Sequence, residues 1–272
     1  ETTTAWVNDP GPPQLLADGS FLLASERTGW RHLYRFAPNG NCLGPITAGP
    51  WEVRDVKHVD EAGGFIYFMG TKDAVGEDHL YRVPLAGGEP VRLTAAAASH
   101  NITFAPNGNS YIDTYSSRET PPRIDLYSPG GERLRPLHTT EVPELEQYQF
   151  GQSEAITIPA GDGETLDATL LKPHDFDPAK TYPVWFQVYG GPHYPTLRNR
   201  WSKPYHLFDE VLASSGIVVL RVDPRSASGR SAASAWRAYR QLGVAELRDL
   251  EAAVDWLKSQ PWADRERVRI SG

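Results

Sequence analysis

A strand that ends on a glycine is the first indication of chemistry in this chain. Residues 267–271, "RVRIS", read as a short buried strand, and they run directly into Gly272. A nucleophile elbow, the G-x-S-x-G turn that carries a reactive serine between a strand and a helix, opens on a glycine in this position. We therefore predict that Gly272 is the first glycine of such an elbow, with the nucleophile beyond it.

Other side chains with nucleophilic or basic character are placed less favourably. Ser226, Ser228 and Ser231 follow a strand, but they lack the strand, G-x-S-x-G and helix setting of an elbow serine. His193 follows the turn "YGGP" and has no carboxylate close to it in sequence that would orient it as a base. We expect none of these four residues to do the chemistry.

The composition is typical of a globular protein and restricts the class of ligand. Of the 272 residues, 40% are hydrophobic and 22% are charged. A net charge of −7 argues against a nucleic-acid partner, because phosphate binding needs a basic surface. The histidines form no H-E-x-x-H motif or His/Cys cluster, and no glycine-rich phosphate loop occurs, so we predict neither a metal nor another cofactor.

Cysteine content and apolar runs leave the cellular compartment open. The single cysteine, Cys42, can form no disulfide within the chain, and we expect it to be a small core residue. No stretch approaches the roughly 18 apolar residues of a membrane span. The chain opens on Glu1 without a signal-peptide pattern, so we expect it to be part of a longer polypeptide, either cytoplasmic or periplasmic/extracellular.

An internal repeat dominates the first half of the chain. The tetrapeptide "HLYR" begins at His32 and again at His79, 47 positions later, and "ITA" at Ile46 returns as "LTA" at Leu93 with the same shift. β-rich runs punctuated by Asn-Gly and Gly-Gly turns lie between these landmarks. Short strands that recur about every 40–50 residues are typical of β-propeller blades. We predict about three blades over residues 1–138, with the two tetrapeptides on equivalent strands; a β-sandwich is the alternative.

The second half, residues 153–272, has a different pattern, and residues 139–152 are expected to link the two. A hairpin around Gly161 comes first, and three buried strands then alternate with two helices. The helix over residues 244–258 should pack through one apolar face, formed by Leu247, Leu250, Val254 and Leu257. This order predicts a mostly parallel, doubly wound sheet covered on both faces, which is the first half of an α/β-hydrolase domain.

Several segments together resemble one family of peptidases. Those of the first half are similar to the last propeller blades of dipeptidyl peptidase IV-like serine peptidases of the prolyl oligopeptidase superfamily: "SERTGWRHLY", "HLYRVPL" and "YSSRETPP". Those of the second half resemble the start of the catalytic domain: "LLKPHDFDPAKTYPVWFQVYGGP", "QLGVAELRDLEAAVDWL" and "DRERVRISG". In this family the serine follows two positions after the glycine that corresponds to Gly272. The resemblance therefore implies that the Ser, Asp and His of the triad lie outside this chain, and that the 272 residues alone are inactive.

The resemblance also suggests roles for a few residues. It implies that Tyr189 donates a hydrogen bond in the oxyanion hole, where a neutral phenol is a suitable donor and Gly190 and Gly191 let the backbone approach closely. The alternative is a strand-end aromatic packed on the core. Asp223 and Arg225 stand where the family has a D-x-R-G-type segment, and we interpret them as an ion pair that shapes a loop near the site.

Three functions remain open at this stage. The resemblance favours a serine exopeptidase that releases di- or tripeptides from peptide N-termini, with proline or alanine preferred at the scissile position, a peptide substrate and a homodimer as an open possibility. An oligopeptidase or acylaminoacyl peptidase on the same scaffold is the second reading. The third is a non-catalytic binding protein, which arises when a hydrolase loses its serine.

Overall fold

The computed structural model of the chain describes residues 3–192, 194–201, 203–227 and 229–272. It divides into two compact units, each of which is described by itself. Unit 1 comprises Glu1–Glu141, Asn199–Trp201 and Gly229–Ala233. Unit 2 comprises Val142–Arg198, Ser202–Ser228 and Ser234–Gly272.

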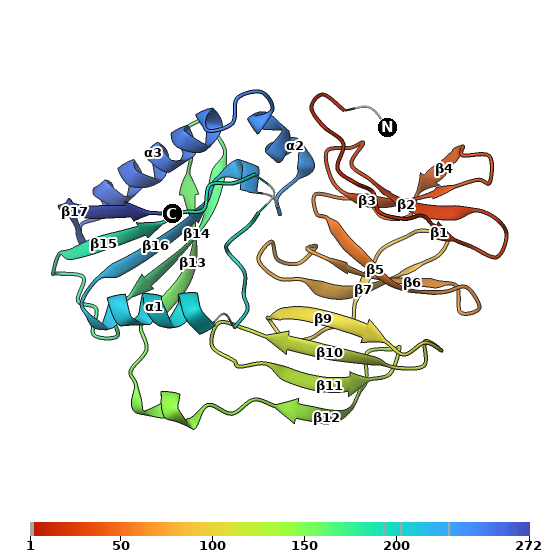
Figure 1. Cartoon of the computed structure of the whole chain (residues 1–272), viewed down its shortest axis with the longest axis horizontal. Coiled ribbons are helices and arrows are strands. Elements are labelled where there is room, and N and C mark those ends of the chain that lie inside the picture. Colours follow the sequence, from red (N-terminus) through yellow and green to blue (C-terminus); the bar gives the residue numbers. More distant parts are fainter. Residues whose placement is uncertain (1–2, 193, 202, 228) are drawn as a thin grey trace. The chain divides into compact units, whose positions relative to one another are not determined.

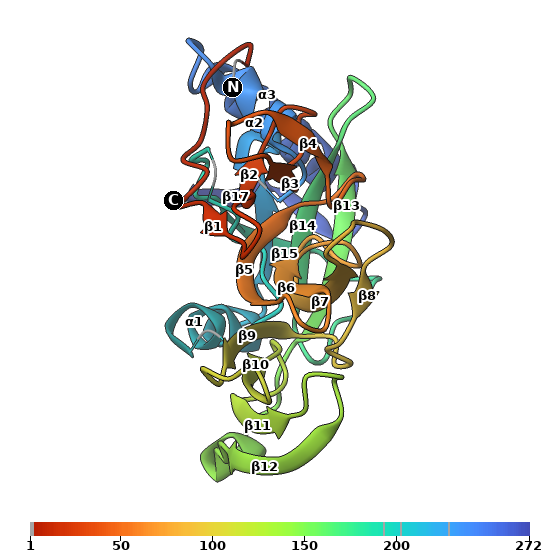
Figure 2. The same ribbon diagram turned by 90° about the vertical axis from the view of Figure 1, so that its right-hand side faces the viewer.

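Unit 1 contains three four-stranded antiparallel sheets whose strands follow one another in chain order (Figures 1 and 2). The first sheet consists of β1 (Gln14–Leu15), β2 (Phe21–Ser25), β3 (His32–Phe36) and β4 (Cys42–Pro45). The second consists of β5 (Val53–Asp60), β6 (Phe65–Gly70), β7 (His79–Pro84) and β8 (Val91–Arg92). The third consists of β9 (Ser99–Phe104), β10 (Tyr111–Ser116), β11 (Arg123–Tyr127) and β12 (Arg133–Thr139). Such meanders are the form of propeller blades, and the three together make a portion of a propeller and not a closed ring.

The "HLYR" repeats occupy equivalent strands, as predicted. They open β3 and β7, the third strands of their sheets. In each copy the histidine Nδ1 lies 3.0 Å from a threonine Oγ1, His32 from Thr47 and His79 from Thr94. The same threonine hydroxyl accepts the backbone N–H of the residue after the histidine, at 3.0 Å in the first copy and 3.2 Å in the second. The 47-residue period therefore records a repeated contact between the third strand and the segment that follows the fourth.

The core of unit 1 lies between its sheets. Strand β6 of the second sheet is buried on both faces, because Ile66 and Phe68 pack in a cluster with the first sheet, and Tyr67 and Met69 pack in a cluster with the third. This explains why "FIYFMG" is a continuous apolar run without polar alternation. Trp51 joins the first of these clusters and stacks on Phe68 at 5.8 Å between ring centroids.

Unit 2 is built on a five-stranded mixed sheet with the strand order β13-β14-β16-β15-β17 (Figure 1). β13 and β14 form the predicted antiparallel hairpin, β14 pairs antiparallel with β16, and β15 runs parallel to both β16 and β17. The strands are β13 (Gln152–Pro159), β14 (Thr165–Lys172), β15 (Tyr182–Gln187), β16 (Val218–Asp223) and β17 (Ala263–Ser271). Its long helices are α1 (Lys203–Ser214) and α3 (Val244–Ser259), with short 3-10 helices at Pro143–Gln147, Arg225–Ala227 and Trp236–Ala238. The short helix α2 (Ala232–Ala235) begins in unit 1 and ends in unit 2.

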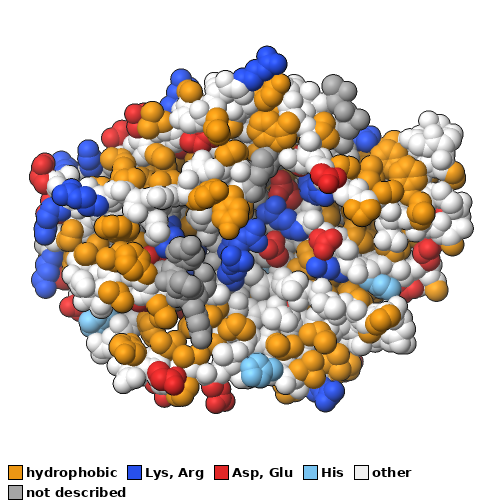
Figure 3. Space-filling view, in the orientation of Figure 1, with side chains coloured by type: hydrophobic (Ala, Val, Ile, Leu, Met, Phe, Trp, Pro, Cys, Tyr) orange, Lys and Arg blue, Asp and Glu red, His pale blue; other side chains and the backbone are white. Residues whose placement is uncertain are grey.

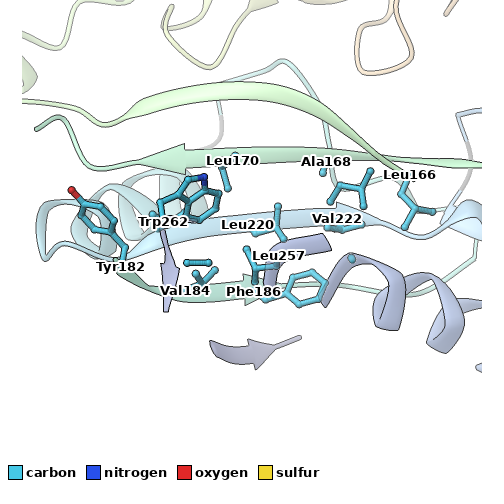
Figure 4. Close-up of a cluster of buried hydrophobic side chains, with 14 residues drawn as sticks. Leu166, Ala168, Leu170, Tyr182, Val184, Phe186, Leu220, Val222, Leu257 and Trp262 are labelled. Atoms are coloured by element: carbon cyan, nitrogen blue, oxygen red, sulfur yellow. The ribbon is translucent and has the colours of Figure 1, made fainter. Parts of the chain in front are cut away.

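The two long helices cover opposite faces of this sheet (Figure 1). Alternate residues of β16 separate the two faces: Leu220 and Val222 join the cluster that contains Leu257 of α3, and Val219 joins the one that contains Ala213 of α1. Figure 4 shows the first cluster, in which side chains of β14, β15 and β16 gather beside Leu257 and Trp262. Helices on both faces are the arrangement that parallel strands require, and they agree with the predicted double winding.

Three local predictions about packing are wrong. Residues 267–271, which were expected to form a buried strand, lie in β17 at the edge of the sheet, where Ile270 is 58% exposed. Leu247 does not join the buried face of α3 but is 57% exposed, and the fully buried positions of that helix include Asp249 and Ala253. Cys42 is exposed and not a core residue, because β4 is the outermost strand of its sheet and three of its four residues face solvent. Apolar, acidic and basic side chains are interspersed on the face shown in Figure 3, which fits the ordinary composition.

Candidate active site

The carboxyl ends of β15 and β17 meet at one edge of the sheet in unit 2. The two strands run parallel with Gln187 opposite Ser271, and the N–H of Val188 donates to the carbonyl of Ser271 at 2.9 Å. Gly272 follows beside Val188, and a Cβ at Gly272 would collide with the Val188 carbonyl oxygen. A glycine is therefore required at this point by the close approach of the neighbouring strand.

Tyr189 lies two residues beyond the end of β15, at the same edge. Its side chain is 61% exposed, so it is not a core aromatic, and its ring packs on that of Tyr194 at 4.9 Å between centroids. Gly190 has a φ of +75°, in the left-handed region that favours glycine. A Cβ at Gly191 would collide with the Tyr189 ring. The two glycines therefore make the turn and give the phenol its position.

Asp223, the last residue of β16, holds the loop that follows Tyr189. Its carboxylate accepts hydrogen bonds from the N–H and Oγ1 of Thr196, at 2.9 and 2.6 Å, and from the N–H of Leu197 at 3.0 Å. Burial raises the pKa of Asp223, and these hydrogen bonds oppose the rise. Through Thr196 and Leu197, this residue fixes the backbone two and three positions beyond Tyr194.

Arg225 binds different partners, so the prediction of an ion pair between Asp223 and Arg225 is wrong. The Arg225 Nε donates to Asp249 Oδ1 of α3 at 2.8 Å, and its Nη1 donates to Asp162 Oδ2 of the β13–β14 hairpin at 2.6 Å. Hydrogen bonding to Asp249 above all raises the pKa of Arg225, which keeps its charge at every ordinary pH. The two residues diverge because Asp223 still belongs to the strand, whereas Arg225 begins a 3-10 turn packed on α3.

The serines considered from the sequence show no elbow geometry among the described residues. Ser226 is fully buried in the 3-10 turn, and its Oγ has no hydrogen-bond partner in the described part of the chain. Ser231 lies next to the start of the short helix α2. His193 and Ser228 lie outside the described residues. Ser226 is therefore a packed turn residue that no solvent-borne substrate can reach.

The exposed phenol of Tyr189 gives this edge a hydrogen-bond donor. No group of three or more His, Cys, Asp or Glu side chains is arranged to hold a metal ion within residues 3–192, 194–201, 203–227 and 229–272. An exposed phenol hydroxyl beside the end of a parallel strand can donate to an oxygen that gains negative charge. Of the residues that shape this edge, Thr196 and Asp249 were not anticipated from the sequence, because their partners are distant along the chain.

Sequence comparison identifies matching families for both halves of the chain. Residues 1–122 match the dipeptidyl peptidase IV N-terminal region, and residues 207–272 match the prolyl oligopeptidase family. The chain is dipeptidyl peptidase IV-like. It is 32% identical to dipeptidyl peptidase 8 of Mus musculus and 30% identical to dipeptidyl peptidase 8 of Homo sapiens, and both alignments cover 100% of the chain and 35% of the relative.

Solved structures agree with this match. The crystal structure of Porphyromonas gingivalis dipeptidyl peptidase 4 superimposes with a TM-score of 0.90 at 30% sequence identity, over 99% of this chain and 38% of that one. The chain thus spans about a third of the length of the curated relatives it matches. Within the part that the structure describes, no helix is both long and apolar enough to cross a lipid bilayer.

Proposed function

We propose that this chain is part of a serine exopeptidase that releases di- or tripeptides from the N-termini of peptides, with proline or alanine preferred before the scissile bond. The observation that carries the proposal is the exposed Tyr189 at the sheet edge where β15 ends beside Gly272. The dipeptidyl peptidase names of the relatives support the reaction class. The nucleophilic serine, the histidine and the aspartate are proposed to come from residues outside these 272.

In this proposal Tyr189 acts at the oxyanion. Attack of the serine oxygen on the scissile carbonyl turns the carbonyl oxygen into an oxyanion, while the serine proton passes through the histidine to the departing amine. The C–N bond then breaks and leaves an acyl-enzyme, which water hydrolyses. The Tyr189 hydroxyl donates to the oxyanion, and it binds that charge more strongly than the neutral carbonyl, so its contribution appears in kcat.

The surrounding residues shape the site without touching the substrate. Gly190 and Gly191 form the turn that presents Tyr189, and Gly272 is proposed as the first glycine of the elbow. Asp223 holds the loop after Tyr189 through Thr196, and Arg225 ties the turn after β16 to α3.

A substrate panel on the full-length protein separates the three functional readings. We expect hydrolysis of Gly-Pro p-nitroanilide, no hydrolysis of the N-acetylated compound, and complete inhibition by a fluorophosphonate. Hydrolysis of the N-acetylated compound would favour the oligopeptidase or acylaminoacyl peptidase reading. Absence of both hydrolysis and fluorophosphonate labelling would favour a non-catalytic binding protein. Residues 1–272 expressed alone should be inactive in the same assay.

Tyr189→Phe tests the oxyanion role directly. We expect kcat to fall by about 10²–10³-fold with little change in KM, because one donor to the oxyanion is lost and the ring is kept. Tyr194→Phe is the matched control, since it removes a hydroxyl from the neighbouring ring. Equal, small effects of the two substitutions would return Tyr189 to a packing role.

A further inference from the structure

Asn199 lies ten residues after Tyr189 and binds with every polar group it has. Its backbone N–H donates to the carbonyl of Gly76 at 2.8 Å, and its backbone carbonyl accepts the N–H of Ser99 at 2.8 Å. Its side chain makes three further hydrogen bonds. Asn199–Trp201 accordingly belong to unit 1, although the residues that precede them belong to unit 2.

The three side-chain bonds select an amide at this position. Oδ1 accepts the N–H of Arg118 at 3.1 Å, and Nδ2 donates to Glu77 Oε1 at 2.7 Å and to the carbonyl of Ala97 at 3.0 Å. These partners come from three separate segments of unit 1, which follow β6, β8 and β10. The position requires an NH₂ group that donates to two acceptors and an oxygen that accepts one N–H. The side-chain amide of an asparagine provides both.

Glu77, the only charged partner of the amide among these contacts, is itself held in place. Its second oxygen, Oε2, lies 2.8 Å from His79 Nε2, and His79 in turn is bonded to Thr94. Burial would raise the pKa of Glu77, but the hydrogen bonds with His79 and Asn199 outweigh it and lower the pKa, so the carboxylate is ionised. The Asn199 amide therefore donates to a carboxylate that His79 already holds in position, and His79 is held by the His–Thr contact of the second sheet.

The same segment is also fixed just before Asn199. Thr196 and Leu197 are bound by Asp223 within unit 2, as described above. Beyond Asn199, the N–H of Trp201 donates to Ser116 Oγ at 3.1 Å in unit 1. The backbone between the Tyr189 turn and α1 is thus restrained at two consecutive points, one in each unit.

We propose that Asn199 is a positioning residue for Tyr189: its docking on the segments after β6, β8 and β10 restrains the loop that carries the phenol. The proposal rests on the proposed function of Tyr189. Its physical basis is that a segment that loses one of its two anchors samples more conformations, and displacement of a reacting group by about 1 Å can cost about 10²-fold in rate.

A double-mutant comparison in the full-length protein tests this link. Asn199→Ala should lower kcat for Gly-Pro p-nitroanilide by about tenfold or more, with a smaller effect on KM. In the Tyr189→Phe background the same substitution should lower kcat by less than about twofold, because the donor that it positions is already absent. Asn101→Ala, the same substitution at an exposed residue of β9, is the control and should change neither constant. An undiminished effect of Asn199→Ala in the Tyr189→Phe background would overturn the proposal.

A charge rearrangement gives an independent variant. Asn199→Asp places a carboxylate against Glu77 and the Ala97 carbonyl, so it should reduce kcat at least as much as Asn199→Ala. Adding Glu77→Gln supplies an amide donor to that carboxylate and should recover kcat to within about threefold of wild type. Failure of Glu77→Gln to recover any activity would show that the Glu77 contact does not position the loop.

Hydrogen exchange separates failure of this proposal from failure of the proposed function. In Asn199→Ala, peptides that cover Arg118 and residues 189–198 should exchange their amide protons faster than in wild type, and Asn101→Ala should leave them unchanged. This readout needs no activity. If the wild-type protein hydrolyses no peptide but the exchange changes as expected, the proposed function fails and the restraint stands. Unchanged exchange over residues 189–198 would remove the restraint itself.

Discussion

The two units use buried polar side chains in different ways. In unit 1 the contacts are repeated: His32 with Thr47 and His79 with Thr94 have the same atoms, the same 3.0 Å distance and a 47-residue shift. In unit 2 the buried polar contacts that we describe are not repeated. Arg225, for example, joins two distant segments by donating to Asp249 of α3 and to Asp162 of the β13–β14 hairpin. Repeated contacts stabilise each sheet internally, whereas single contacts fix loops and turns at the sheet edge where we propose the chemistry.

The third sheet shows where the repeat ends. Asp125 occupies the position one before Leu126 that the histidines hold in the other two copies, and it is buried. Instead of a threonine it binds Arg133, whose Nε and Nη2 each donate at 2.8 Å, and the Tyr115 hydroxyl at 3.2 Å. A sheet can therefore keep its shape while the polar pair within it changes from His–Thr to Asp–Arg.

The largest effect should come from breaking the single contact in unit 2. Arg225→Met should lower the free energy of unfolding by about 3–5 kcal/mol, because it leaves the fully buried Asp249 without its charged partner. Arg237→Met is the control: its ion pair with Glu164 is exposed and should contribute no more than about 1 kcal/mol. Urea denaturation of the full-length proteins, followed by circular dichroism, gives both values. Equal losses would contradict the contrast between buried and exposed pairs.

The repeated contact should give two equal, smaller effects. Thr47→Val and Thr94→Val each remove a hydroxyl that serves both a histidine and a backbone N–H, so each should cost about 1–3 kcal/mol. The two losses should agree within about 0.5 kcal/mol if the contacts are equivalent. Thr139→Val, at an exposed residue of β12, should be nearly neutral. Clearly unequal losses in the same denaturation experiment would show that the repeat is one of sequence and not of energetics.

The smallest effect concerns two glutamates of unit 1 with opposite pKa shifts. Burial raises the pKa of Glu52, so the folded protein holds that proton longer than the unfolded chain, and stability falls as the pH rises above the ordinary glutamate pKa. Glu77 has a lowered pKa, as described above, so its contribution is lost as the pH falls below that value.

Glutamine variants isolate these two contributions. With rising pH, wild type should lose stability relative to Glu52→Gln and gain stability relative to Glu77→Gln. Thermal unfolding at a series of pH values, from acid to neutral, measures both differences. Slopes of the same sign for the two variants would show that burial alone governs both carboxyl groups.

Much of the fold could be predicted because its signals are local. The "HLYR" repeat and the turns around it predicted the third strands of the first two sheets, and the hairpin at Gly161 preceded strands and helices in the expected order. The face of α3 was mispredicted because apolar spacing placed Leu247 inside, whereas the buried face includes Asp249. A charged residue such as Asp249 can be buried only when an oppositely charged partner such as Arg225 lies beside it. Helical periodicity carries no information about that partner.

The sequence by itself determined the repeat period, the succession of strands and helices, and the glycines at the turns, since these depend on residues a few positions apart. Only the tertiary structure decided which polar groups meet. Asp223 binds Thr196 across 27 residues, Arg225 binds Asp249 across 24, and Asn199 binds Glu77 across 122. Each pair forms because partial or complete burial removes water from its polar groups, which must then find hydrogen bonds in the segment that the fold brings beside them.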